Sequence, residues 1–190
     1  MKRKTLFISI GLHALCLTVV FIFQGMIFSH IRVDGFTPLL LPLVSTAVAV
    51  YEGRVAGGVA GLFAGILCDL SFGDPVAVFT IILTFTGLAI GTLVDTVVTR
   101  GFVTYFMFCV GVLALCAVIQ GLQLVIVIYS LQLQLINLGI PPVEIPPIHD
   151  LMQNALWQII YSLIFAVPIW IFVSAIGKRV YRESMSGKPQ

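Results

Sequence analysis

The sequence predicts an all-α integral membrane protein: one domain, residues 1–190, with six transmembrane helices and both termini in the cytoplasm. Apolar residues make up 59% of the chain and charged residues 9%, and the mean hydropathy is +1.12. A soluble domain of this length could not keep so much apolar surface from water. The formal net charge is only +2, from few and scattered basic residues. We therefore expect membrane lipid around the chain and no nucleic-acid partner.

The first two apolar stretches are expected to leave the cytoplasm and return to it. Residues 5–29 follow a basic start, residues 1–4. This stretch is about twice as long as a signal-peptide core, so a retained anchor is predicted. Residues 38–51 are short for a span and contain Pro42, which predicts a small tilt or a kink.

The third and fourth stretches, residues 54–70 and 75–99, have the length and apolar composition of membrane spans. Between them, Gly73-Asp74-Pro75 has the order of a helix stop, an N-cap and a proline at the first helical position. We therefore expect the fourth helix to begin at Pro75.

The fifth stretch, residues 102–135, is too long for a simple span, because its roughly 34 residues would reach about 50 Å as a helix. Leu and Gln alternate near its end, so that part is expected to lie at or beyond the membrane interface. The sixth stretch, residues 151–177, follows Asp150, and Gln153 three residues later gives a capping-box-like start.

Lysine and arginine set the expected orientation. With six spans and the amino terminus inside, nine of the ten Lys and Arg residues fall on the cytoplasmic side, and only Arg32 falls outside. This bias is the positive-inside pattern, so both termini are predicted to be cytoplasmic. The inner basic residues are Lys2, Arg3, Lys4, Arg54, Arg100, Lys178, Arg179, Arg182 and Lys188.

Four glycines and one aspartate follow one another at intervals of four residues. They are Gly53, Gly57, Gly61, Gly65 and Asp69. On a helix this spacing makes a smooth strip against which another backbone can lie, and such strips drive helix association in lipid. We predict that the strip is the main close-packing surface. Packing within the chain is the favoured prediction, and packing against a partner protein stays open.

A similar pattern recurs one helix later. The order Gly-Leu-x-x-Gly-x-Leu-x-Asp of residues 61–69 returns in residues 87–95, where the matching positions are Gly87, Gly91 and Asp95. Because consecutive spans run in opposite directions, this echo would be an inverted repeat. Chance similarity between Gly- and Leu-rich segments is the alternative.

The chain offers no constellation of catalytic or metal-ligating residues. Its three histidines, His13, His30 and His149, are not spaced at i, i+4 with another ligand, and its four cysteines lack CxxC spacing. No nucleophile elbow or phosphate-binding loop is present. We expect no catalytic residues, no metal, no cofactor and no enzymatic activity.

Two groups of polar residues have alternative interpretations. The first comprises Gln120, Gln123, Asn154 and Gln158. These side chains are expected in the outer half of the bilayer, either as interhelical hydrogen-bond partners, which we favour, or as a polar pocket for a small solute. The second comprises Glu52 and Arg54, which flank Gly53 in a short cytoplasmic turn. This pair is interpreted as an interfacial charge pair or, alternatively, as a docking point for a cytoplasmic partner.

Residues 51–75 resemble the segment typical of the bacterial rod-shape-determining MreD family. The matching features are the glycine strip, the Gly-x-x-x-Asp step and a short loop with Gly and Pro: Gly57, Gly61, Gly65, Asp69, Gly73 and Pro75. The resemblance covers residues 38–100 and is architectural elsewhere. The chain departs from the pattern at residues 76–79, Val-Ala-Val-Phe, where many relatives have a small residue or glycine.

The resemblance implies a non-enzymatic, multi-pass scaffold of the bacterial inner membrane. Such proteins support cell shape and organise peptidoglycan synthesis in the cell-elongation machinery. The implied partners are the bitopic protein MreC and, through it, MreB, RodA and a class B penicillin-binding protein.

The MreD fold is also similar to the substrate-binding S components of energy-coupling-factor transporters for vitamins and other small solutes. S components often carry Ala-x-x-x-Ala in the first helix, where this chain has only Ala14 and Thr18. The four polar residues of the fifth and sixth helices keep this alternative open.

Overall fold

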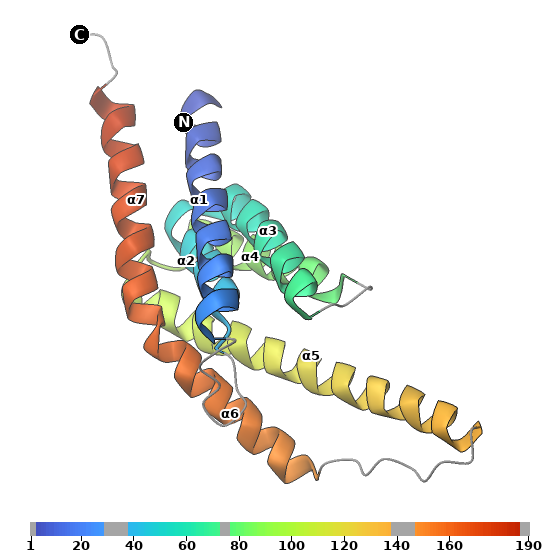
Figure 1. The fold of residues 1–190 in the computed structure, drawn as a ribbon. Helices are drawn as coiled ribbons and strands as arrows, with labels where there is room; N and C mark the ends of the chain where they lie inside the picture. The colour runs from blue at the N-terminus through green and yellow to red at the C-terminus, as the bar shows by residue number, and fades with distance from the viewer. Residues whose placement is uncertain (1–2, 29–37, 73–76, 138–146, 187–190) are drawn as a thin grey trace.

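The computed structural model describes residues 3–28, 38–72, 77–137 and 147–186, and every element among them is helical (Figure 1). The prediction of an all-α protein is therefore confirmed for this part of the chain. The helices are α1 (Arg3–Phe23), the π-helical turn η1 (Gln24–Phe28), α2 (Leu40–Glu52), α3 (Arg54–Phe72), α4 (Val78–Thr96), α5 (Phe102–Asn137), α6 (Ile148–Ile164) and α7 (Ala166–Ser186).

Several helices have the length and apolar composition of membrane spans. They are α3, α4 and α5, and the bent pair α6 and α7 adds a fourth candidate. The apolar parts of α1 and α2 are shorter in the described residues, at Gly11–Met26 and Leu40–Glu52. Among the described residues the structure thus supports a membrane-embedded protein with three or four candidate spans, and the six spans that the sequence predicts stay a prediction.

Helix α2 is the centre of the fold. Every residue from Leu40 to Val50 is buried, and α2 contacts α1, α3, α4, α5 and α7. A helix that is apolar on all sides is expected in an interior of this kind. Pro42 lies in the first turn, where its missing N–H breaks no helical hydrogen bond.

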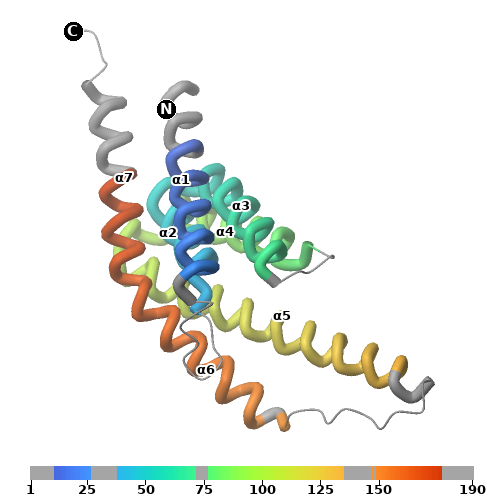
Figure 2. The backbone as a smooth tube through the Cα atoms, viewed as in Figure 1, coloured from blue at the N-terminus to red at the C-terminus, as the bar shows by residue number. Residues whose placement is uncertain are grey.

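Two pairs of helices, α3 with α4 and α1 with α7, pack beside α2. Helices α3 and α4 form an antiparallel pair with the most extensive contact between any two helices of the fold. Helices α1 and α7 lie beside each other, and the N-terminal end of α1 and the C-terminal end of α7 point to the same end of the molecule (Figure 1). Figure 2 shows that α5 begins beside α7 and extends to the lower right of the view, below α3 and α4.

The start of α4 differs from the prediction. The helix begins at Val78 and not at Pro75, because Ala77 has left-handed backbone angles, φ 53° and ψ 35°. The expected helix stop and N-cap at Gly73 and Asp74 lie outside the described residues. The helix also ends at Thr96, three residues before the predicted position 99.

The last predicted span is two helices. Helices α6 and α7 meet at Phe165 with a bend of 42°. Pro168 explains the break, since proline has no N–H for the carbonyl of residue 164 and its ring crowds that carbonyl. The capping-box interpretation was wrong: α6 begins at Ile148 after Pro147, and Asp150 lies inside its first turn.

Helix α5 continues further than its predicted boundary. It is a single helix of 36 residues that includes the Leu-Gln alternation near its end. At about 1.5 Å per residue it is about 54 Å long, more than the ~30 Å of a bilayer core.

Candidate functional site

The glycine strip of α3 lies directly against α4. A Cβ atom added at Gly57 would stand 2.6 Å from the Ala49 Cβ atom and 2.8 Å from the Gly87 carbonyl oxygen. One added at Gly61 would fall on the carbonyl group of Leu83, and one at Gly65 on the backbone of Thr80. The strip therefore packs within the chain, and only glycine fits at this approach distance.

Helix α4 contributes its own two glycines to the same contact. A Cβ atom at Gly87 would fall on the Gly57 carbonyl group. A Cβ atom at Gly91 would stand 2.5 Å from the Arg54 Cα atom. Backbone therefore meets backbone along both helices, which is the geometry that small-xxx-small strips permit in lipid.

Asp69, at the carboxyl end of α3, caps the amino end of α4. Its Oδ1 atom accepts a hydrogen bond from the Phe79 N–H at 3.0 Å, and its Oδ2 atom accepts one from the Thr80 N–H at 2.9 Å. The Thr80 hydroxyl donates a third bond, at 2.5 Å, to Oδ2. The side chain is 7% exposed. An aspartate from the neighbouring helix thus satisfies the backbone donors that a helix start leaves unpaired.

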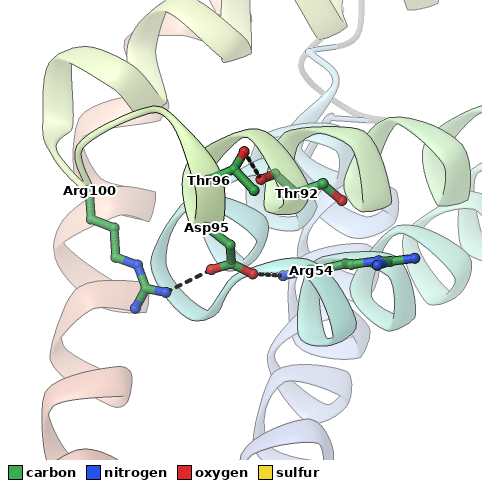
Figure 3. A network of polar contacts seen from close by, with 5 residues as sticks. All are labelled: Arg54, Thr92, Asp95, Thr96 and Arg100. Carbon is green, nitrogen blue, oxygen red and sulfur yellow. Dashed lines mark hydrogen bonds and ion pairs between the residues drawn. The ribbon is translucent and has the colours of Figure 1, made fainter.

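Asp95 performs the same task at the opposite end of the pair (Figure 3). Its Oδ2 atom accepts a hydrogen bond from the Arg54 N–H, the first of α3, at 3.0 Å. Its Oδ1 atom lies 2.9 Å from the Arg100 guanidinium. In the same view the Arg54 side chain extends away from Asp95.

The contacts of α3 and α4 obey an approximate two-fold symmetry. Adding 26 to a residue number in α3 gives the equivalent position in α4, because Asp69 matches Asp95 (95 − 69 = 26) and Arg54 matches Thr80 (80 − 54 = 26). Under this rule the bond from Thr80 to Asp69 becomes the bond from Arg54 to Asp95. The glycine contacts obey it as well: Gly65 meets Thr80, and Gly91 meets Arg54. The echo in the sequence is therefore an inverted repeat in structure.

The turn between α2 and α3 requires glycine for two reasons. Gly53 has φ +91°, a backbone conformation that favours glycine. A Cβ atom there would also stand 2.5 Å from the Asp95 Oδ1 atom. The Asp95 carboxylate can therefore reach the Arg54 N–H only because residue 53 has no side chain.

Glu52 pairs with a histidine and not with its neighbour in the turn. Its Oε1 atom lies 3.6 Å from the His13 Nε2 atom on α1, and the His13 and Glu52 side chains are 3% and 9% exposed. A cavity of about 10 Å³ next to His13 has room for one water molecule at most. Arg54 makes no ion pair with any described residue and is exposed. The structure thus separates the two charges that sequence reasoning placed together.

Two further caps hold the central helix, and sequence reasoning missed both. The Leu39 N–H donates to the Ser162 hydroxyl at 2.9 Å, and the Leu40 N–H donates to the Gln24 side-chain oxygen at 3.3 Å. Each donor belongs to the start of α2 and each acceptor to another helix. Polar residues inside apolar stretches were the available signal, but their partners lie far away in sequence.

The four polar residues of the predicted pocket have different environments. Asn154 is exposed, whereas Gln120, Gln123 and Gln158 are half-buried. The Gln120 Nε2 atom is buried and has no hydrogen-bond partner among the described residues. None of the four residues lines the cavity next to His13 or the groove along α3 and α4.

An open groove of about 500 Å³ runs along the outer side of the α3–α4 pair. Its lining comes from both helices: Arg54, Val55, Gly58, Val59, Leu62, Thr84 and Leu88. Within the described part of the chain, no group of three or more His, Cys, Asp or Glu side chains is placed to hold a metal ion.

These features define an α-helical membrane protein built around a central helix and an internally capped, glycine-packed helix pair. Comparisons of the chain with protein-family models, with curated proteins and with solved structures find no match.

Proposed function

We propose that this chain is a non-enzymatic membrane scaffold of the bacterial cell-elongation machinery. In this proposal all six apolar stretches cross the inner membrane, both termini are cytoplasmic, and the chain supports cell shape and peptidoglycan synthesis together with an MreC-like protein. The observation that carries the proposal is the reciprocally capped α3–α4 pair, in the segment whose sequence resembles the MreD family.

The polar groups of this pair support a scaffold because they are used to position helices. Both oxygens of Asp69 and both oxygens of Asp95 accept bonds within the chain. In lipid, backbone donors have no water to bond with, so caps of this kind fix one helix against the next. A rigid helix pair is well suited to hold partner proteins in a fixed relative arrangement.

The partners follow from the resemblance and from the charge distribution. The proposed direct partner is an MreC-like bitopic membrane protein, with MreB, RodA and a class B penicillin-binding protein reached through it. Lys and Arg residues concentrate in the segments assigned to the cytoplasm, which agrees with the positive-inside pattern.

One observation favours a second candidate, the S component of an energy-coupling-factor transporter. The buried Gln120 Nε2 atom lacks a hydrogen-bond partner among the described residues, and buried polar atoms are normally satisfied. A bound solute would supply the missing acceptor.

The test is affinity purification of the protein from its native membrane in mild detergent, followed by mass spectrometry of retained proteins and small molecules. The scaffold proposal expects MreC-like and cell-wall synthesis proteins and no solute. A matched purification of Gly61→Leu should lose these proteins, because the substitution forces α3 away from α4. Recovery of ABC-type ATPases, or of a solute that Gln120→Ala no longer retains, would contradict the scaffold and establish the transporter.

A further inference from the structure

The groove on the outer side of α3 and α4 combines a charged end with an apolar floor. On α3 its lining residues lie at i, i+1, i+4, i+5 and i+8, which is one face of a helix over two turns. Arg54 stands at the start of this face and Leu62 at its far end, about 12 Å further along the helix axis. The groove therefore runs inward from the end of the candidate span.

The charged group at this end of the groove is the Arg54 guanidinium, and it is not neutralised by an ion pair with any described residue. Asp95 already pairs with the Arg100 guanidinium and with the Arg54 N–H. The Arg54 guanidinium has no ion-pair partner among the described residues. Arginine binds phosphate oxygens through a fixed fork of donors, so the mouth of the groove is complementary to an anionic headgroup.

The rest of the lining is complementary to a hydrocarbon chain. Val55 and Leu62 are exposed to the surroundings. The Thr84 hydroxyl donates to the Thr80 carbonyl oxygen at 2.6 Å, so it needs no partner in the groove. The volume of about 500 Å³ falls within the range of small-ligand sites, about 300–1,000 Å³.

A partner helix fits this groove less well than a lipid does. The closest approach of two helices in lipid uses a strip of small residues, and Gly57, Gly61 and Gly65 already face α4. Gly58, the glycine inside the groove, is covered by the Leu88 side chain, which would stand 2.5 Å from an added Cβ atom. A flexible acyl chain needs no such strip.

We propose that this groove is a specific site for one anionic phospholipid, with the phosphate at Arg54 and one acyl chain along Val55, Gly58, Val59 and Leu62. The site does not depend on the elongation partners of the preceding subsection. It lies at the end of α3 where Glu52, Asp95 and Arg100 also gather, which is the end expected at headgroup level.

The test uses the full chain in nanodiscs that contain phosphatidylcholine and phosphatidylglycerol, with native mass spectrometry of the lipids retained after release. The protein should retain one phosphatidylglycerol in preference to phosphatidylcholine. Arg54→Gln should reduce this preference about fivefold, as expected for one Arg near anionic lipid. Arg54→Lys should preserve most of the preference because the charge is kept.

Two tryptophan variants separate the groove from the remaining lipid-facing surface. Val55→Trp fills the groove and should abolish retention, whereas Val118→Trp, exposed on α5 away from the groove, should leave it unchanged. Retention that survives both Arg54→Gln and Val55→Trp would overturn the proposal. A disulfide formed between two copies of Val55→Cys would overturn it as well, since a second copy would then occupy the groove.

Discussion

Asp69 and Asp95 lie near the carboxyl ends of two antiparallel helices, α3 and α4. The carboxylate of each aspartate accepts backbone hydrogen bonds from the first turn of the other helix. Asp69 binds the start of α4, and Asp95 binds the start of α3. Each helix of the pair therefore supplies the cap of its neighbour. The two caps differ in burial, since Asp69 is buried and Asp95 is exposed.

The first prediction concerns the buried cap. Asp69→Asn keeps the shape of the side chain but replaces one acceptor oxygen with a donor, which would face the Thr80 or Phe79 N–H. The free energy of unfolding should fall by about 1–3 kcal/mol, the cost of leaving a buried donor unsatisfied. Reversible unfolding in mixed micelles measures it. Thr80→Val, which removes only the hydroxyl bond, should cost less; an equal loss in the two variants would mean that the backbone caps contribute nothing.

The second prediction compares the two caps. Asp95→Asn should destabilise less than Asp69→Asn, because exposed ion pairs such as Asp95–Arg100 contribute little, about 0–1 kcal/mol. The effects should add in the double variant, since the two sites lie at opposite ends of the pair and share no partner. A coupling energy well above about 0.5 kcal/mol would show that the caps are not independent.

The third prediction concerns the buried contact between α1 and α2. Glu52→Ala removes the carboxylate that lies 3.6 Å from the His13 Nε2 atom, at a site where the two side chains are 9% and 3% exposed, and should cost about 1–3 kcal/mol. In a double-mutant cycle, His13→Ala should cost little once Glu52 is already absent. Equal costs of His13→Ala in both backgrounds would show that the pair does not interact.

The fourth prediction concerns the break between α6 and α7. Pro168→Ala restores a backbone donor and should straighten the 42° bend. Spin labels attached at Leu156→Cys and Phe172→Cys, both exposed positions, should lie further apart in Pro168→Ala than in the unchanged chain. Double electron–electron resonance measures this distance. Val167→Ala serves as the control and should leave the distance unchanged. If the distance were unchanged in Pro168→Ala, the bend would be caused by packing around Phe165 and not by the proline.

The fifth prediction uses the native thiols. Cys16, Cys68, Cys109 and Cys116 are all free and buried, so N-ethylmaleimide should modify them slowly in the folded protein and completely after denaturation in SDS. Val97→Cys, in the exposed turn after α4, should add one rapidly modified site. Rapid modification of any native cysteine would contradict the packing of the helix that carries it: α1 for Cys16, α3 for Cys68, and α5 for Cys109 and Cys116.

Local patterns in the sequence were sufficient to predict part of this structure. Glycines at four-residue spacing identify a packing face because a helix repeats every 3.6 residues. The matching order of residues 61–69 and 87–95 indicated the inverted repeat, which the bonds of Asp69 and Asp95 display. Both signals come from residues close together in the chain, so they can be recognised in a single sequence.

Other features depend on contacts that local patterns do not encode. The caps from Ser162 and Gln24 to the start of α2 join residues 123 and 16 positions apart. The burial of α2 on every side depends on five other helices. Pro168 was a visible signal for the break in the last span, but the apolar run on both sides of it favoured one helix.

The most direct test of the account compares four glycine-to-alanine variants by their free energy of unfolding. Gly61 and Gly87 face backbone atoms of the neighbouring helix, whereas Gly111 and Gly121 of α5 have nothing within 4 Å of an added Cβ atom. Gly61→Ala and Gly87→Ala should each destabilise by about 1–3 kcal/mol through overpacking. Gly111→Ala and Gly121→Ala should stabilise by up to about 1 kcal/mol through helix propensity. If all four variants changed stability by the same amount and in the same direction, α3 and α4 would not be packed backbone to backbone.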